Sequence, residues 1–227
     1  MIVIFDLDGT LIDSAPDIHA TSNIVLAAQG LDALSLAEVR GFIGRGVPHL
    51  VDCLLYRHGI RDAGLAAHMA AEFTRHYETA VTLTRPYAGV PETLRALSGM
   101  GRRLAVCTNK PVSPARAVLA HLGLAQHFTA VIGGDSLPRR KPDPAPLRLA
   151  HAACGGGPVL YVGDSEVDAE CARAAAIPFA LFTEGYRRTP VEDLPHAAAF
   201  DDFARLVQLV EAFAAQADGS ARRLSNA

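Results

Sequence analysis

The sequence has few cysteines, no large excess of charge of either sign and no long hydrophobic run. Its four cysteines, Cys53, Cys107, Cys154 and Cys171, lie far apart and form no CxxC pair, so we expect buried reduced thiols rather than a zinc or redox motif. The formal net charge of -3 offers no overall basic field for nucleic acid phosphates. No apolar run reaches membrane-spanning length. We therefore expect neither a nucleic acid nor a membrane as partner.

The chain passes directly from Met1 into the apolar run IVIF, without the basic segment and long apolar region of a signal peptide. A cytoplasmic protein is the resulting expectation. Hydrophobic residues make up 50% of the sequence and charged residues 20%, which supports a sizeable packed core. With 227 residues, we predict a core domain that carries a smaller one.

Short apolar runs bounded by polar or turn residues recur along the chain and predict buried, parallel strands. These runs are residues 2–5, 103–108, 128–134, 159–164 and 179–183. The segments between them show helical patterns, with Ser, Asp or Pro at their starts and Gly at most of their ends. The alternation predicts an α/β fold with a doubly wound, mostly parallel sheet.

Residues 14–84 break this alternation, because they contain amphipathic helical stretches and no convincing strand. We predict that they form a small α-helical cap domain inserted into a core made of residues 1–13 and 85–217. Since the insertion leaves the core just after the first strand, the cap should lie over the carboxyl end of that strand. Residues 218–227 are expected to form a frayed, disordered tail.

The segment FDLDGT places Asp6 and Asp8 at the carboxyl end of the first predicted strand, where open parallel sheets bind ligands. Two carboxylates on the same side of an extended chain repel each other, and a divalent cation is the simplest compensation. On its own, the motif is equally compatible with a polar turn. An EF-hand calcium loop is excluded, because a register with Gly9 at the glycine position would make Ile4 and Ala15 ligands.

Three further strand ends carry polar residues suited to phosphate or metal. Thr108, Asn109 and Lys110 can bind phosphoryl oxygens through hydroxyl, amide and backbone N–H groups, or Thr108 and Asn109 can simply cap the next helix. Lys141 precedes a proline, which biases its backbone to an extended conformation, although a loop lysine is often only a solvated charge. Asp164 ends a strand, where a carboxylate is costly without a metal or donor. Asp168 either orients a metal-bound water or favours the first turn of a helix.

Together these strand ends converge on one crevice, and their chemistry is that of phosphoryl transfer. Asp6 would attack phosphorus while Asp8 handles the proton. Thr108 and Lys141 would offset the equatorial charge, and Asp164 would help to hold Mg²⁺, which prefers all-oxygen sites. Asp8 can best keep a proton available if its backbone carbonyl, rather than its carboxylate, contacts the metal.

The segments DLDGT, KPDP and GDSEVD, together with Thr108 after an apolar strand, resemble the four motifs of the haloacid dehalogenase-like phosphatases. The resemblance covers nearly the whole chain and implies a Rossmann-like core with a helical cap. It implies Asp6 as nucleophile, Asp8 as acid/base, and Thr108 and Lys141 as ligands of the phosphoryl group. It also implies a magnesium site made of Asp6, Asp164 and the backbone carbonyl of Asp8.

Within this superfamily the chain is most similar to the phosphoglycolate phosphatases, through segments such as DLDGTLIDSAPDI, GFIGRGVPHLV, CTNKP and VGDSEVDAECARAA. The implied activity is hydrolysis of 2-phosphoglycolate to glycolate and phosphate through an aspartyl-phosphate intermediate. We predict substrate binding by Thr108, Asn109, Lys141 and Arg45, the last placed in a cap loop to meet the substrate carboxylate. Arg45 is alternatively a surface charge or a phosphate contact. The paired arginines of EGYRR have no assigned role.

Other activities stay open at this point. The substrate can be another sugar or amino-sugar phosphate, or pyrophosphate. A β-phosphoglucomutase-like sugar phosphomutase shares the fold, although Thr10 resembles the phosphatases, because those mutases often have a valine there. A non-catalytic phosphate-binding module is disfavoured because every expected catalytic position is filled, and a dehalogenase would not require Asp8. Both a monomer and a homodimer are compatible with the sequence.

Overall fold

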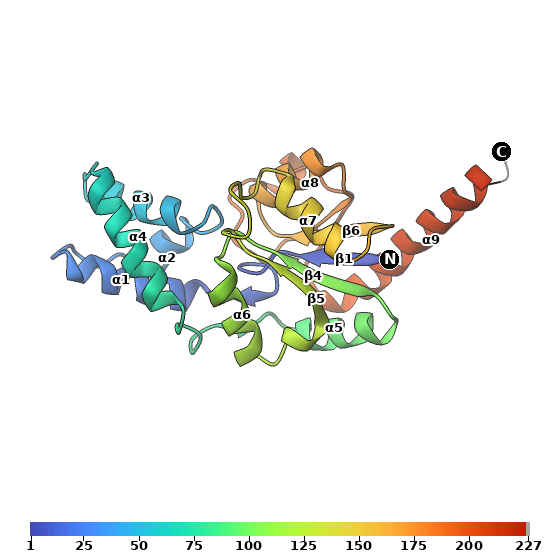
Figure 1. The fold of residues 1–227 in the computed structure, drawn as a ribbon, viewed down its shortest axis with the longest axis horizontal. Coiled ribbons are helices and arrows are strands. Elements are labelled where there is room, and N and C mark those ends of the chain that lie inside the picture. The colour runs from blue at the N-terminus through green and yellow to red at the C-terminus, as the bar shows by residue number, and fades with distance from the viewer. Residues whose placement is uncertain (226–227) are drawn as a thin grey trace.

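A parallel sheet with β1 at its centre organises the core. The structure, a computed structural model, describes residues 1–225, with side chains through residue 217. The described residues form a six-stranded sheet in the order β5-β4-β1-β6-β7-β8 (Figure 1). Its strands are β1 (Ile2–Phe5), β4 (Arg103–Cys107), β5 (Phe128–Ile132), β6 (Val159–Gly163), β7 (Phe179–Phe182) and β8 (Ala198–Phe200). Since β1 pairs with β4 and β6, residues that follow it lie beside the ends of both neighbours.

The five predicted strands are confirmed, with ends within one or two residues of those expected. β8 was missed because its three residues, AAF, are too short a run to stand out from the preceding loop. Every pairing in the sheet is parallel, which confirms the doubly wound α/β class.

Helices cover both faces of the sheet because the residues of β1 alternate between two hydrophobic cores. Val3 and Phe5 pack with residues of α5, α6 and α9, whereas Ile2 and Ile4 pack with residues of α7 and α8. These helices are α5 (Val90–Gly99), α6 (Val112–His121), α7 (Ala145–Ala153), α8 (Glu166–Ala175) and α9 (Leu206–Ser225). All four residues of β1 are fully buried, so the strand holds its carboxyl end in a fixed place.

A second group of helices lies beside the sheet, at the left of Figure 1, and forms the cap. Its helices are α1 (Ala15–Ala28), α2 (Leu36–Arg40), α3 (Val47–Arg57) and α4 (Ala63–Tyr77). The cap has its own hydrophobic cluster, in which Val51 and Leu54 of α3 pack with Met69 and Phe73 of α4. The cap therefore has a hydrophobic core that is separate from the two cores of the sheet.

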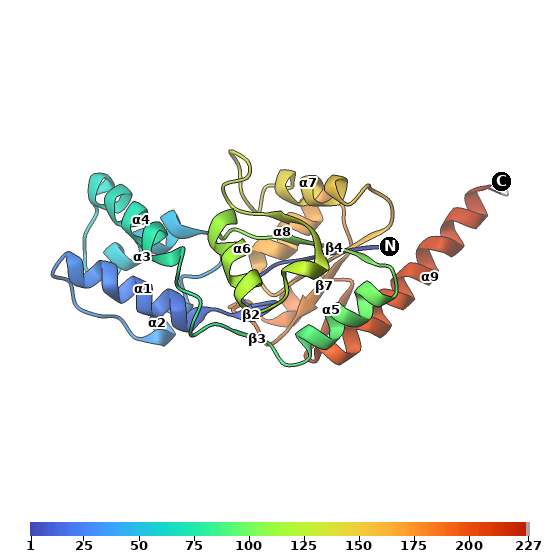
Figure 2. The same cartoon turned by 60° about the horizontal axis from the view of Figure 1, so that its bottom comes forward.

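The two linkers between core and cap run side by side. β2 (Ile12–Asp13) and β3 (Arg85–Pro86) pair antiparallel, with Ile12 opposite Pro86, and Figure 2 shows them at the junction. An insertion that leaves and re-enters the core at residues 14 and 84 requires its two linkers to lie together, and this pairing meets that requirement.

Helix α9 extends away from the sheet and reaches Ser225 (Figure 1). The predicted frayed tail over 218–227 is thus wrong for residues 218–225, where the strong helix formers Ala, Arg and Leu offset the cost of Gly219. Asn226 and Ala227 lie outside the described residues. In the described part of the chain, no helix combines the length and apolar character needed to cross a membrane.

Candidate active site

Asp6 follows β1 directly and lies almost fully buried at the end of the sheet. Its backbone N–H donates to the Val162 carbonyl of β6 at 2.8 Å, which extends the strand pairing by one residue. The chain then turns at Gly9, whose φ is +89°. A Cβ on Gly9 would lie 2.5 Å from Asp164 Oδ2, so the turn requires glycine both for its backbone and for space.

Lys141 connects Asp6 to a buried polar network. Its Nζ lies 2.9 Å from Asp6 Oδ1 and 2.7 Å from Asp168 Oδ1, and donates to the Tyr161 hydroxyl at 2.9 Å. Burial opposes the charge on Lys141, but the carboxylates of Asp168 and Asp6 outweigh it and raise its pKa well above the ordinary value. The neighbouring carboxylates thus favour the charged form of the ammonium that faces Asp6.

Asp168 holds Lys141 in place and also begins helix α8. Its Oδ1 accepts from the Tyr161 hydroxyl at 2.6 Å, and its Oδ2 accepts from the Ser165 hydroxyl at 2.6 Å within a capping box. Burial disfavours the carboxylate, but Lys141 and then the Ser165 hydrogen bond lower its pKa below the ordinary value. Of the two roles predicted for Asp168, its place in the first turn of a helix is confirmed. Its ion pair with Lys141 and its hydrogen bond from Tyr161 were not predicted.

The Asp164 carboxylate is positioned by two donors from other loops. Oδ1 accepts from the Thr10 hydroxyl at 2.7 Å, and Oδ2 accepts from the Tyr186 backbone N–H at 2.6 Å. Burial, followed by repulsion from Asp168 and Asp6, raises its pKa well above the ordinary value. Burial and Asp168 likewise raise the pKa of Asp6 to about 7, despite the nearby Lys141.

The surroundings of Asp6 and Asp164 suit a divalent cation. Oxygen atoms of Asp6, Asp164 and Asp168 all lie within 4.8 Å of one another. Asp168 pairs closely with Lys141, whereas burial and then repulsion between the carboxylates raise the pKa values of Asp6 and Asp164, so a cation beside these two groups would be stabilising. Carboxylate oxygens are hard ligands of the kind that Mg²⁺ prefers, so these residues fit that ion.

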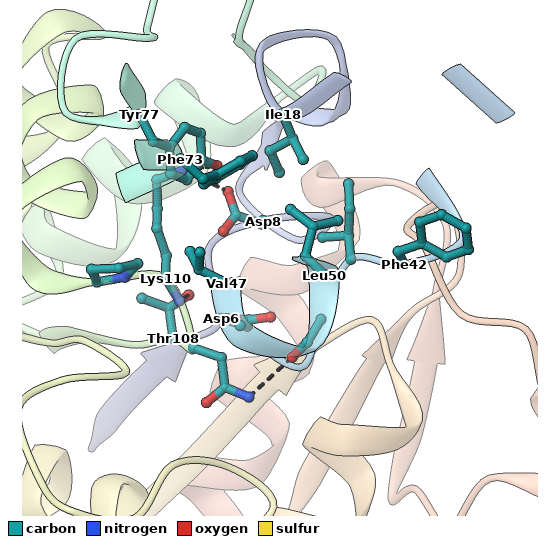
Figure 3. A pocket seen from close by; sticks show the side chains of 15 residues that line it. Asp6, Asp8, Ile18, Phe42, Val47, Leu50, Phe73, Tyr77, Thr108 and Lys110 are labelled. Carbon is teal, nitrogen blue, oxygen red and sulfur yellow. Dashed lines mark hydrogen bonds and ion pairs between the residues drawn. The ribbon is translucent and has the colours of Figure 1, made fainter. Parts of the chain in front are cut away.

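Asp8 belongs to a different group of side chains. Its Oδ1 accepts from the Ser14 hydroxyl at 2.6 Å and from Lys110 Nζ at 3.1 Å. Lys110 Nζ also donates to the hydroxyl of Tyr77, which comes from the last turn of cap helix α4. Figure 3 shows the Lys110 side chain running from the Thr108 loop toward Asp8 and Tyr77. The two neighbouring aspartates thus have separate lysine partners.

The sequence predicted a phosphate contact from the backbone near Lys110, but the role of the Lys110 ammonium beside Asp8 was missed. A signal was available in the composition, because the sequence contains only two lysines, Lys110 and Lys141, among its 21 cationic residues. Both are buried, with 6% and 2% of their surface exposed. Burial lowers the pKa of Lys110, against the opposing effect of Asp8.

The remaining predicted residues lie around the same crevice. Thr108 is buried just after β4, and its Oγ1 accepts from the Lys110 backbone N–H at 3.2 Å. The Asn109 side-chain amide donates to the carbonyls of Gly44 and Lys141, at 3.0 and 2.9 Å, and so ties the cap loop to the core. Substrate binding by Asn109 therefore remains a prediction, and its carboxamide already has another task.

Two pockets open on either side of Asp6 and Asp8. The first, shown in Figure 3, also contains Thr108 and Lys110 and has walls of apolar cap residues. The second lies between the cap loop with Arg45 and the core loop with Arg188, and it contains polar and charged side chains. Arg45 itself is exposed. The structure thus brings the two aspartates into both pockets but places Arg45 in the second alone.

Tyr186 of the EGYRR segment links the site to the base of the cap. Its hydroxyl accepts from the N–H groups of Ser14 and Ala15, at 2.9 and 3.0 Å, and donates to Asp13 at 2.7 Å. Its own N–H binds Asp164, as described above. The sequence pattern gave no indication of these Tyr186 contacts.

Two arginines follow Tyr186 in the EGYRR segment. Arg187 donates to the Thr183 carbonyl, and Arg188 is exposed in the second pocket.

Comparisons with known proteins agree with this arrangement. The family model described as haloacid dehalogenase-like hydrolase matches residues 3–182. Phosphoglycolate phosphatases from Cereibacter sphaeroides and Rhodobacter capsulatus are 52% and 50% identical over 210 residues, covering 92% of this chain and 96% of each relative. The crystal structure of a predicted phosphoglycolate phosphatase from Haemophilus somnus has a TM-score of 0.86 and 32% identity, covering 92% of this chain and 97% of that one. The resemblance seen in the motifs is confirmed, and the chain belongs to the haloacid dehalogenase-like hydrolases.

Proposed function

We propose that this phosphoric monoester hydrolase is a magnesium-dependent phosphatase that converts 2-phosphoglycolate and water to glycolate and inorganic phosphate. The observation that carries the proposal is the division of labour between the two aspartates. Asp6 faces Lys141 and the buried carboxylate of Asp164, whereas Asp8 faces Lys110 and Ser14. Asp6 thus lies beside the groups that would bind a phosphoryl group, which suits it for attack on phosphorus. Asp8 lies apart from them, which leaves it for proton transfer.

In the first step, a carboxylate oxygen of Asp6 attacks phosphorus and the bond from phosphorus to the ester oxygen breaks. Asp8 gives a proton to the departing alkoxide, which leaves as glycolate. Lys141 and Thr108 offset the negative charge of the transferring phosphoryl group. In the second step, Asp8 takes a proton from water, whose oxygen attacks the aspartyl-phosphate and releases inorganic phosphate and free Asp6.

Mg²⁺ would be held by the carboxylates of Asp6 and Asp164 and, as the sequence predicts, by the backbone carbonyl of Asp8. When bound, the ion neutralises the phosphate oxygens and keeps Asp6 ionised. Thr10 and the Tyr186 N–H orient Asp164, and the Lys141–Asp168 pair keeps a second positive charge beside Asp6.

The choice of substrate rests on the relatives named phosphoglycolate phosphatase, at 50–52% identity over most of both chains. The exposed Arg45 of the second pocket would attract a negatively charged substrate at long range. Cytoplasmic location and a monomeric or homodimeric state remain predictions.

The proposal is tested by measuring phosphate release from 2-phosphoglycolate, a hexose phosphate, an amino-sugar phosphate and pyrophosphate, with Mg²⁺ and with EDTA. We expect 2-phosphoglycolate to have the highest kcat/KM and EDTA to abolish release. Asp6→Asn should be inactive, whereas the control Asp201→Asn, at an exposed surface ion pair, should match the wild type. Isomerisation of the hexose phosphate without phosphate release would instead indicate a phosphomutase, and faster release from another ester would replace the proposed substrate.

A further inference from the structure

The pocket in Figure 3 combines an apolar wall with a single buried cation. Phe42, Leu50 and Phe73 of the cap contribute to the wall, while Asp8 and Lys110 lie on the core side. Among the described residues that line this pocket, Lys110 carries the one positive charge. An anion that enters a pocket of this kind loses its water, and it then needs a hydrogen-bonded cation as partner. The pocket therefore suits a small ligand with one negative group beside Lys110.

Lys110 has bonding capacity left for such a ligand. An ammonium group has three N–H donors. Two of them reach Asp8 Oδ1 and the Tyr77 hydroxyl, and these are its side-chain hydrogen bonds within the described part of the chain. The Nζ also lies 3.8 Å from the centre of the Tyr77 ring, which holds the ammonium at the boundary between core and cap. One N–H is therefore available.

The position of Lys110 beside Asp8 also suits it to bind the carboxylate of the substrate. In the proposed reaction Asp8 protonates the leaving oxygen, so that oxygen must lie within hydrogen-bonding reach of the Asp8 carboxylate. The carboxylate of 2-phosphoglycolate is attached to the carbon that bears the leaving oxygen. It must therefore lie close to Asp8 as well, and the cation that lines the first pocket within reach is Lys110, whose Nζ lies 3.1 Å from Asp8 Oδ1. Arg45, in contrast, is exposed and lines the other pocket.

We propose that Lys110 binds the carboxylate of the substrate and is the residue by which this site selects a carboxylate-bearing phosphate ester, with the Tyr77 hydroxyl of the cap orienting its ammonium. This inference rests on the proposed function. It assigns the two lysines of the chain to the two ends of one substrate, with Lys141 at the phosphoryl group and Lys110 at the carboxylate. A buried, charge-assisted hydrogen bond of this kind corresponds to a discrimination of about 10- to 100-fold.

The test compares 2-phosphoglycolate with ethyl phosphate, in which a methyl group replaces the carboxylate. Lys110→Met removes the charge and keeps an unbranched side chain that is one heavy atom shorter. Because Lys110 also pairs with Asp8, both substrates should lose activity, but kcat/KM for 2-phosphoglycolate should fall about 10- to 100-fold further than for ethyl phosphate, mainly through KM. Lys110→Arg should recover part of the discrimination. Arg45→Ala tests the competing assignment and should change the ratio of the two kcat/KM values by less than about threefold. The matched control, Arg205→Met, removes a cation from an exposed surface ion pair and should leave both kcat/KM values unchanged.

An equal loss for both substrates would overturn the proposal and leave Lys110 as a positioning residue for Asp8. A ratio that collapses in Arg45→Ala and not in Lys110→Met would assign the carboxylate to Arg45 instead. If the wild type does not hydrolyse 2-phosphoglycolate at all, the proposed function fails; if it does and the ratio stays unchanged in Lys110→Met, the Lys110 assignment alone fails.

A second measurement needs no substitution at a buried charge in the protein under test. ¹⁵N labelling of lysine gives two side-chain ammonium signals from the two lysines of the wild type, and the signal missing in Lys110→Arg identifies Lys110. Glycolate, added with inorganic phosphate and Mg²⁺, should shift the Lys110 signal, and ethanol should not. A Lys110 signal that glycolate leaves unmoved at saturation, or that ethanol moves equally, would contradict the proposal.

Discussion

The surroundings of the two lysines differ in which part of the molecule supplies them. Lys141 has all its partners in the core: Asp6 after β1, Tyr161 in β6 and Asp168 in α8. Lys110 is shared, because Asp8 belongs to the core and Tyr77 belongs to cap helix α4. The first lysine is thus held whether or not the cap is in place, and the second is completed by the cap.

From this difference we expect phosphoryl transfer to depend on the core and the choice of substrate to depend on the contact between cap and core. On the core side, the carboxylates of Asp6 and Asp164 fit Mg²⁺ and the Lys141 ammonium faces Asp6, so under the proposed mechanism cations would offset the charge of the phosphoryl group that transfers to Asp6. The cap side of the first pocket is apolar apart from the Tyr77 hydroxyl, which contacts Lys110 of the core, so under our proposal it would distinguish leaving groups by their charge and size. A change in the core should therefore affect every substrate alike, whereas a change in the cap should affect substrates differently.

The largest effect is expected from Asp6→Asn, which removes the proposed nucleophile and barely changes volume. Phosphate release should fall by at least ~1,000-fold for 2-phosphoglycolate and ethyl phosphate alike. Stopped assays with both substrates and Mg²⁺ check this. Substantial activity toward one of the two esters would break the division between core chemistry and cap selection.

The same substitution should change the pH dependence of stability in EDTA. The pKa of Asp6 is about 7 in the folded protein, against an ordinary value of 3.8, so between these values the folded state binds more protons than the unfolded state. The free energy of unfolding should fall as pH rises through this window, by up to about 1.4 kcal/mol per pH unit. Asp6→Asn should lack this contribution, and Mg²⁺ should counteract it in the wild type. Urea unfolding at pH 5, 6 and 7 measures how the free energy of unfolding changes with pH. The same pH dependence in the wild type and in Asp6→Asn would contradict the prediction.

Stability also distinguishes the two lysines. Lys141→Met leaves Asp168 fully buried without its cation and should lower the free energy of unfolding by about 3–5 kcal/mol. Lys110→Met should cost less, about 1–2 kcal/mol, because the Asp8 side chain is 12% exposed and keeps its Ser14 hydrogen bond. Urea unfolding in EDTA compares the two variants. Equal costs would show that both lysines are part of one network.

Much of the core half of the site could be predicted from local patterns. Apolar runs identify the strands, and polar residues directly after them, such as Asp6, Thr108 and Asp164, must lie at one edge of a parallel sheet. That reasoning depends on chain direction and alternation alone, so it needs no knowledge of side-chain packing. The pairing of the cap linkers follows from the same topology.

The cap half could not be predicted in this way. Tyr77 and Lys110 meet because α4 packs with a particular rotation against the core loop, and the amphipathic pattern of α4 does not determine its partner. The same holds for Tyr186, which lies 172 residues from Ser14 along the chain. Asp168 was recognisable as a helix-start residue, but its ion pair depends on where the loop with Lys141 folds back.

Tyr186→Phe should have an intermediate effect, since this tyrosine joins the two regions. Without the hydroxyl, the N–H groups of Ser14 and Ala15 lose an acceptor, at a cost of about 1–3 kcal/mol. The cap is then less firmly seated, so KM for 2-phosphoglycolate should rise by more than KM for ethyl phosphate. Tyr56→Phe, at an exposed position of α3, is the matched control. A loss of kcat that is equal for both esters would place Tyr186 with the core chemistry, through Asp164.

The smallest effect is expected at Glu38, which lies in the first turn of cap helix α2 and does not line either pocket. Hydrogen bonds from the Ser35 N–H and hydroxyl, together with Arg57, lower the pKa of Glu38 to about 2 from an ordinary 4.5. Because the folded pKa is depressed, this contribution is complete above pH ~4.5 and is lost as pH falls through about 2. Glu38→Gln should therefore unfold slightly more easily than the wild type at pH 7, and equally easily near pH 2, with both kcat/KM values unchanged. Thermal unfolding at the two pH values and the two-substrate assay check this. A shift in the ratio of the two kcat/KM values would mean that selection depends on the whole cap, and not on the part of it that reaches Lys110.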